Sequence, residues 1–182
     1  MGMPNAKRGY YFKTQHRLKT FNYSSATSYF LTFNTRENRP VLSKVQKAAD
    51  GGAVVVLTPI GAVADKYVKS IESHYENVSV DAYVVMPTHV HLLLTVTKTQ
   101  APTNQQSSLI AKIIRSTKTL VSKEIGEKIW QDDYYDIVAD TDRIYDRCYD
   151  YSRYNPIVWL TRGGAEPDEG DFESPDDLLP PE

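Results

Sequence analysis

One run of residues, YVVMPTHVHLLL from Tyr83 to Leu94, most constrains the fold of this chain, because it places two histidines two residues apart in an apolar segment. Successive side chains of a β-strand point to opposite faces, so His89 and His91 are expected to project from the same face. Two neutral imidazoles side by side are half of a metal site. The alternative is a pair of half-exposed strand histidines without chemistry, and so short a motif does not decide between them.

Length and composition describe one globular domain with modest extensions, since 182 residues are enough for a sizeable core. No apolar run approaches the roughly 18 residues that span a membrane, and the N-terminal sequence MGMPNAKRGYYFKTQ lacks the apolar stretch of a secretory signal. The single cysteine, Cys148, permits no internal disulfide and no cysteine-based zinc site. We therefore expect a cytoplasmic protein with no membrane partner.

Charge divides the chain into three segments. The acidic segment 163–182 carries eight carboxylates and no Lys or Arg, so residues 1–162 carry +6 although the whole chain carries −2. We expect this tail to be disordered, and it could act as a solubilising segment or compete with nucleic acid. Residues 1–20 form a basic arm interleaved with aromatic residues, which suits phosphate contacts and base stacking but also an ordinary frayed terminus. Segment 21–162 is the predicted folded domain.

The hydrophobic pattern predicts alternating strands and helices. Strands are expected at 28–35, 53–57, 78–85, 89–96 and 129–138, and helices at 41–49, 63–75, 107–125 and 142–155. This order is typical of an α+β protein in which helices pack on one face of an antiparallel sheet. The histidine strand would be central, and its open face would need covering by the last helix or by a ligand.

A second candidate cluster, CYDYSRYNPIVW, spans Cys148 to Trp159. Tyr151 and Asn155 are four residues apart and so share one face of a helix, and Pro156 is expected to end that helix at this point. A tyrosine hydroxyl can be a nucleophile, and an asparagine oxygen is a hard ligand that could complete a His-His-Asn divalent site. The alternative is that the tyrosines of this segment only pack the helix against the sheet.

Five stretches in register, between about residues 17 and 162, together resemble the REP-associated tyrosine transposases, within the single-tyrosine HUH transposases. They are FNYSSATSYFLTFNTRENR, YVVMPTHVHLLL, IIRSTKTLVSK, IWQDDYYD and YSRYNPIVW. The resemblance implies a ferredoxin-like or RRM-like HUH endonuclease fold. The chain also departs from the family pattern. Thr88 stands where the family usually has Asn, and Ile137 stands where it often has His. Asp132 and Asp133 make their region less favourable for DNA phosphates.

The resemblance implies a metal-dependent single-stranded DNA endonuclease and strand transferase. His89, His91 and Asn155 would hold Mg²⁺ or Mn²⁺, and Tyr151 would form a 5′-phosphotyrosine intermediate. Single-stranded DNA, often beside hairpins of palindromic repeats, would be the partner, and a homodimer is possible. The candidate DNA-binding residues are Lys112, Arg115, Lys118, Arg17, Lys19 and Tyr134, although a solvated helix face explains the lysines and arginines equally well. The other hypotheses are a domesticated hairpin DNA- or RNA-binding protein without strand transfer, and a metal-dependent RNA-processing module.

Overall fold

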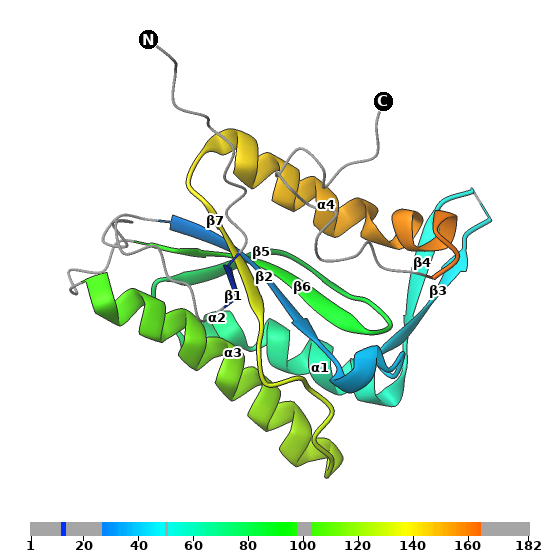
Figure 1. Cartoon of the computed structure of the whole chain (residues 1–182), viewed down its shortest axis with the longest axis horizontal. Coiled ribbons are helices and arrows are strands. Elements are labelled where there is room, and N and C mark those ends of the chain that lie inside the picture. Colours follow the sequence, from blue (N-terminus) through cyan, green and yellow to red (C-terminus); the bar gives the residue numbers. More distant parts are fainter. Residues whose placement is uncertain (1–11, 14–26, 50, 98–102, 165–182) are drawn as a thin grey trace.

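A computed structural model describes residues 12–13, 27–49, 51–97 and 103–164 (Figure 1), and for 12–13 and 103–108 only the backbone. Its main sheet is antiparallel, with the strand order β1–β7–β2–β6–β5. These strands are β1 (Phe12–Lys13), β7 (Tyr135–Ala139), β2 (Thr27–Asn34), β6 (His89–Val96) and β5 (Val78–Val85). The predicted fold class is therefore confirmed, and the histidine strand β6 lies between β2 and β5.

Helices cover both faces of this sheet. On one side lie α1 (Pro59–Lys69), the short α2 (Ile71–His74) and α3 (Thr103–Ile125), while α4 (Asp142–Thr161) lies alone on the other side (Figure 1). The larger core lies between the sheet and helices α1 and α3, and Val90, Leu92 and Leu94 of β6 point into it. The alternate residues of β6 point towards α4, where Leu93 belongs to a much smaller apolar cluster. The open face of the sheet is thus covered by the last helix, which is one of the two covers that the sequence left open.

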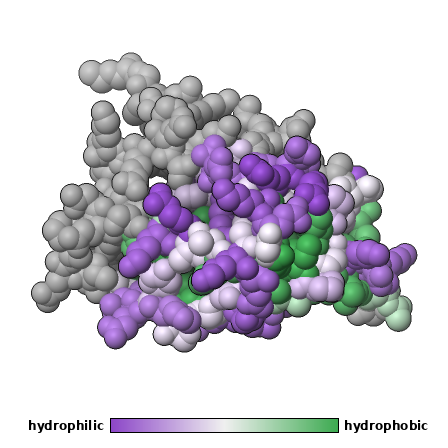
Figure 2. All heavy atoms as spheres, turned by 90° about the horizontal axis from the view of Figure 1, so that it is seen from below, coloured by the Kyte–Doolittle hydropathy of each residue, from purple (hydrophilic) through white to green (hydrophobic). Residues whose placement is uncertain are grey.

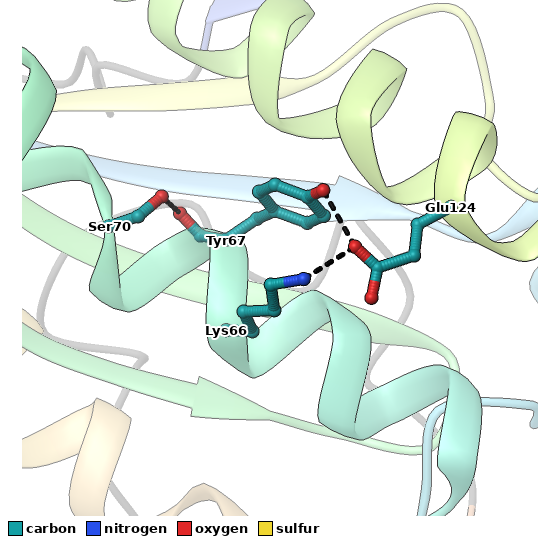
Figure 3. Close-up of polar contacts among 4 residues, drawn as sticks. All are labelled: Lys66, Tyr67, Ser70 and Glu124. Atoms are coloured by element: carbon teal, nitrogen blue, oxygen red, sulfur yellow. Dashed lines mark hydrogen bonds and ion pairs between the residues drawn. The ribbon is translucent and has the colours of Figure 1, made fainter.

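Helix α1 is held at both ends. The hydroxyl of Thr58 accepts a hydrogen bond from the amide of Gly61 at 3.0 Å, which caps the first turn. Near the other end, Lys66 and the hydroxyl of Tyr67 donate to the same carboxylate oxygen of Glu124 on α3, at 2.6 and 2.7 Å (Figure 3). This contact ties α1 to the last turns of α3.

A two-stranded hairpin, β3 (Ser43–Lys47) and β4 (Ala53–Leu57), extends beside the C-terminal part of α4 (Figure 1). The prediction of a helix at 41–49 is wrong. Val45 pairs with Val55 in the hairpin register, and the turn contains Gly51 at a φ of 90°. Cross-strand pairing with β4 outweighed the local helical pattern of this segment.

Three other boundaries differ from the prediction. The strand expected at 129–138 begins only at Tyr135, because the chain before it forms a loop with a single bridge between Trp130 and Thr35. The helix expected at 63–75 begins at Pro59 and is divided at Ser70. Helix α4 does not end at Asn155 but continues through Pro156 to Thr161, since its last turns pack beside the hairpin.

The predicted arm and tail lie outside the described residues, apart from the backbone of 12–13 and residues 163–164. Among the described residues, none of the helices combines the length and the apolar character needed to cross a bilayer. The surface over α1 and α3 is mostly hydrophilic, as Figure 2 shows from below. Hydrophobic side chains gather towards the end where β3 and β4 lie, and Val54, Val56 and Leu57 are the exposed apolar residues of that hairpin.

Candidate active site

Strand β6 presents both predicted histidines to the face that α4 covers. His89 and His91 stand opposite Asn34 and Thr32 of β2, and their ring centroids are 4.4 Å apart. Both side chains are buried, with 1% and 4% of their surface exposed. The shared face predicted from the alternation of a strand is therefore present, but the histidines are not half-exposed.

Helix α4 brings the second cluster onto the histidines. The helix begins at Asp142 with the hydroxyl of Thr141 as its cap, and it lies along the sheet so that Tyr151 and Asn155 face inward. The ring centroid of Tyr151 is 5.1 Å from that of His91, and Nδ2 of Asn155 is 3.4 Å from Nε2 of His91. Two segments far apart in the sequence thus meet in one buried polar cluster, and all four side chains come from one chain.

Two threonine hydroxyls orient the imidazoles. Oγ1 of Thr32 lies 2.8 Å from Nδ1 of His91, and Oγ1 of Thr88 lies 3.0 Å from Nδ1 of His89. With the proton on Nδ1, each ring donates to its threonine and keeps the lone pair of Nε2 for another partner. Thr88, which departs from the family pattern, therefore still makes a polar contact with the first histidine.

Burial keeps both histidines neutral near pH 7. It lowers the pKa of His89 from 6.5 to about 3. Burial, and to a smaller extent the neighbouring His89, lowers the pKa of His91 well below 6.5. A neutral imidazole is the form that binds a metal, so the site is prepared for a cation without losing a proton first.

The donor atoms of the cluster fit a divalent metal. Oδ1 of Asn155 is buried and has no hydrogen-bond partner among the described residues, which is costly unless a further group binds it. An amide oxygen and two imidazoles suit Mn²⁺, and the amide oxygen also suits Mg²⁺. Across the described ranges no three His, Cys, Asp or Glu side chains gather as ligands, so an amide as third ligand is the arrangement that this site offers.

Comparison with solved structures shows a shared fold. The chain superposes on a REP-associated tyrosine transposase bound to a REP hairpin with a TM-score of 0.58, at 18% identity, covering 82% of this chain and 76% of that one. This chain has the fold of that transposase. An uncharacterized protein of Haemophilus influenzae is 26% identical over 171 residues, which cover 83% of this chain and 92% of the relative. No protein-family model matches the chain.

The four predicted DNA-binding residues that the structure describes lie away from the buried cluster. Lys112, Arg115 and Lys118 belong to α3, on the opposite side of the sheet, and Tyr134 is buried just before β7. Lys112 lies 6.0 Å above the ring of Tyr75. Arg17 and Lys19 lie outside the described residues. The structure therefore separates the metal and tyrosine cluster from the α3 cations, and their role in binding DNA stays a prediction.

Lys118 has an internal role in this structure. Its ammonium donates to the backbone carbonyls of Gln131 at 3.0 Å and Asp133 at 2.6 Å, and burial lowers its pKa to about 8. The side-chain amide of Gln131 in turn donates to the carbonyl of Thr35 and to Oδ1 of Asn38, both at 3.1 Å. These contacts fix the loop before β7 between α3 and the end of β2.

Sequence reasoning missed Thr32 and the structural role of Gln131. The residue types alone give no signal for either, because the contact of Thr32 depends on the register between β2 and β6. Once that pairing is known, Thr32 follows as the direct neighbour of His91. The alternation in β2 was visible in the sequence, but the partner strand and its register were not.

Proposed function

We propose that this chain is a tyrosine-dependent single-stranded DNA endonuclease and strand transferase that acts beside hairpins. One observation carries the proposal: the ring of Tyr151 on α4 packs against His91, in the same buried cluster as a second neutral histidine and an unsatisfied amide oxygen. A protein that only binds nucleic acid has no physical need for this combination in its interior. The fold shared with a hairpin-bound transposase supports the same reaction class, by analogy.

The metal would be held by Nε2 of His89, Nε2 of His91 and Oδ1 of Asn155, and Mn²⁺ or Mg²⁺ is the cation proposed. When bound, it would supply positive charge to the non-bridging oxygens of the scissile phosphate. Thr32 and Thr88 orient the two imidazoles towards this task through their Nδ1 atoms.

Tyr151 supplies the nucleophile. Its phenolic oxygen attacks phosphorus, the bond from phosphorus to the 3′-oxygen breaks, and the departing oxygen becomes a 3′-hydroxyl when it takes up a proton. The phenolic proton leaves to solvent. Attack by another 3′-hydroxyl on the phosphotyrosine reverses these steps and rejoins a strand. The bond energy stays in a phosphodiester, so no nucleotide cofactor is required.

The reaction requires the site to open, because Tyr151 is only 2% exposed and Asn155 only 1%. Helix α4 is held to the sheet by an apolar cluster much smaller than the core beneath α1 and α3. We infer that α4 moves relative to β6 when a strand enters. In this structure α4 covers the histidines of its own chain, so the proposed reaction needs no second copy, and the homodimer stays a prediction.

The test is a covalent adduct on a denaturing gel, formed with a pool of single-stranded DNA hairpins and Mn²⁺. We expect the wild-type protein to form an adduct, the Tyr151→Phe variant to form none, and the adduct to need the metal. Tyr154→Phe is the matched control, because Tyr154 lies on the same helix but is 49% exposed. An adduct that survives in Tyr151→Phe and disappears in Tyr154→Phe would refute the assignment of the nucleophile.

One observation favours the domesticated binding protein as a second candidate: the catalytic side chains are closed off in this structure. Hairpin binding without any adduct, across metals and substrates, would support it. RNA of the same sequence belongs in the same experiment. A clear preference for RNA over DNA would point to the RNA-processing alternative.

A further inference from the structure

The side chain of Ser43, the first residue of β3, is buried without a hydrogen-bond partner. Only 2% of its surface is exposed, and no described residue contacts its Oγ with a polar atom at hydrogen-bond distance. A hydroxyl that leaves water without gaining a partner destabilises the folded chain, and an alanine at the same place would avoid that cost. An unpaired buried hydroxyl therefore indicates a partner that binds from outside the chain.

The hairpin directs this hydroxyl away from its exposed face. Side chains alternate along a strand, and residues that pair directly across an antiparallel ladder share a face. Lys44 pairs with Val56, and both are exposed. The next pair on this face, Gln46 and Val54, is exposed as well. Ser43 belongs to the other face, and α4 is the helix that contacts both strands of the hairpin (Figure 1).

The base of the hairpin is joined to the turn that leads into the histidine strand. The amide of Leu42, directly before Ser43, donates to the carbonyl of Pro87 at 3.0 Å, two residues before His89. From the other side, the ring of Trp159 on α4 has its centroid 6.3 Å from that of His89. Strand β3 thus begins at Ser43 where the hairpin, the turn before β6 and the C-terminal half of α4 meet.

The chemistry of this hydroxyl complements that of the proposed metal ligands. Those ligands are lone pairs, on Nε2 of the two histidines and on Oδ1 of Asn155, and lone pairs attract a cation. A phosphodiester is an anion whose non-bridging oxygens accept hydrogen bonds, so holding it also requires donors. The hydroxyl of Ser43 is such a donor, and no described group accepts its proton.

We propose that Ser43 is a further catalytic residue, whose hydroxyl donates a hydrogen bond to a non-bridging oxygen of the scissile phosphodiester. This inference rests on the proposed function. The hydroxyl keeps its proton throughout. Negative charge develops on the non-bridging oxygens as the phenolic oxygen of Tyr151 bonds to phosphorus, so the hydrogen bond is stronger in the transition state than with the bound substrate. The two unpaired atoms then have complementary partners, the cation at Asn155 and the anion at Ser43.

A contact of this kind separates activity from stability. Ser43→Ala removes an unpaired buried hydroxyl, so we expect the midpoint of urea unfolding to stay the same or to rise. With the hairpin pool and Mn²⁺, the rate of adduct formation should fall roughly 100-fold, as for the loss of one donor to developing charge. A hydroxyl that only supported the fold would lower the midpoint and leave the rate of the folded fraction unchanged.

Ser152→Ala is the matched control. Ser152 lies on α4 and is almost as buried, with 3% of its surface exposed, but its hydroxyl donates to the carbonyl of Cys148 at 3.0 Å. Its rate of adduct formation should stay near that of the wild type. Ser43→Thr keeps a hydroxyl and should react faster than Ser43→Ala. If Ser43→Ala forms the adduct as fast as the wild type, or if both alanine variants are slowed equally, the assignment is wrong.

Sulfur substitution tests the contact itself. Sulfur accepts hydrogen bonds more weakly than oxygen, so replacing one of the two non-bridging oxygens at the position that the wild type cleaves should slow adduct formation. In one of the two diastereomers this slowing should be smaller in Ser43→Ala than in the wild type, because the contact is already absent. Equal slowing in the two proteins, for both diastereomers, would refute the hydrogen bond.

Mn²⁺ affinity separates this inference from the proposed function. Isothermal titration should give the same affinity for Ser43→Ala and the wild type, since Ser43 is not a proposed ligand. A wild-type adduct that Ser43→Ala does not slow overturns this inference alone. Absence of an adduct with the wild type overturns the proposed function and this inference together. A large loss of Mn²⁺ affinity in Ser43→Ala would make the serine a metal ligand and overturn its assignment to the phosphate.

Discussion

Nδ2 of Asn155 on α4 lies 3.4 Å from Nε2 of His91 on β6, and Nδ1 of the same imidazole lies 2.8 Å from the hydroxyl of Thr32 on β2. Three elements therefore meet at one histidine. With the proton on Nδ1, the ring donates to Thr32 through that nitrogen, and the contact with Asn155 is made by the nitrogen that would bind a metal. The orientation of the His91 ring consequently depends on residues of both β2 and α4.

Thr32→Val should weaken Mn²⁺ binding by roughly 10- to 100-fold, because the valine removes the acceptor that orients His91. Isothermal titration of the metal into the apo protein measures the change. Thr95→Val is the control, since Thr95 lies on the same face of β6 but bonds to Ser28 and Asp81 at the far end of the strand. Unchanged affinity in Thr32→Val would mean that the threonine does not position the ligand.

Cys148 reports the opening of α4. It is buried in the small cluster between α4 and the sheet, and burial raises the pKa of its thiol to about 12. A thiol in that state reacts slowly, so we expect the folded protein to resist alkylation at pH 8 and to react faster when a hairpin strand and Mn²⁺ bind. Mass spectrometry follows the modification, and no other cysteine competes.

The control for this labelling is Cys148→Ala with Tyr154→Cys, which places the only thiol on the exposed side of the same helix. That variant should react quickly with or without DNA. If Cys148 in the wild-type protein reacts as quickly as this exposed thiol, α4 is not closed over the sheet. If strand transfer proceeds while Cys148 stays protected, the inferred movement of α4 is wrong.

Acid should destabilise the metal-free protein through its buried histidines. In the folded state the pKa of His89 is lowered from 6.5 to about 3, and the pKa of His91 lies well below 6.5. At a pH between the folded and unfolded pKa values, these histidines bind protons in the unfolded chain but not in the folded one. The free energy of unfolding therefore falls as the pH falls below 6.5, by up to about 1.4 kcal/mol per pH unit for each histidine. Above pH 6.5 this contribution is constant.

Urea unfolding in EDTA at pH 7.5, 5.5 and 4.5 measures this dependence. The variant His91→Gln should lose less stability than the wild type over that range, because one of the two linked groups is absent. His74→Gln serves as the control, since His74 is exposed at the end of α2. Identical slopes for the wild type and His91→Gln would contradict the assignment of a neutral, buried His91.

Local pattern was enough for most of the fold, and for selecting the four residues that form the buried polar cluster. The alternation around His89 and His91 and the helical spacing of Tyr151 and Asn155 each place a pair of side chains on one face. The expectation that these two faces meet in one site came from the resemblance to the REP-associated tyrosine transposases. The closure of the site was not predictable, because it depends on how closely α4 packs against β6.

The errors arose where distant contacts decide local structure. Segment 41–49 has residues compatible with a helix, and its strand forms only through pairing with β4. Pro156 removes one helical hydrogen bond, which suggests an end at Asn155, yet the packing of the following residues beside the hairpin maintains the helix. Single-sequence patterns contain neither of these partners.

Position 61 on α1 should tolerate only glycine, because the helix lies against the backbone of Leu42 there. A Cβ at this position would lie 1.8 Å from the carbonyl oxygen of Leu42, a backbone atom that also accepts hydrogen bonds from Thr58. Gly61→Ala should therefore lower the free energy of unfolding by about 1–3 kcal/mol or more, since α1 must shift away. Urea unfolding measures the loss, and Ala62→Ser, at the exposed neighbouring position, is the control. A Gly61→Ala protein as stable as the wild type would show that α1 does not approach Leu42 this closely.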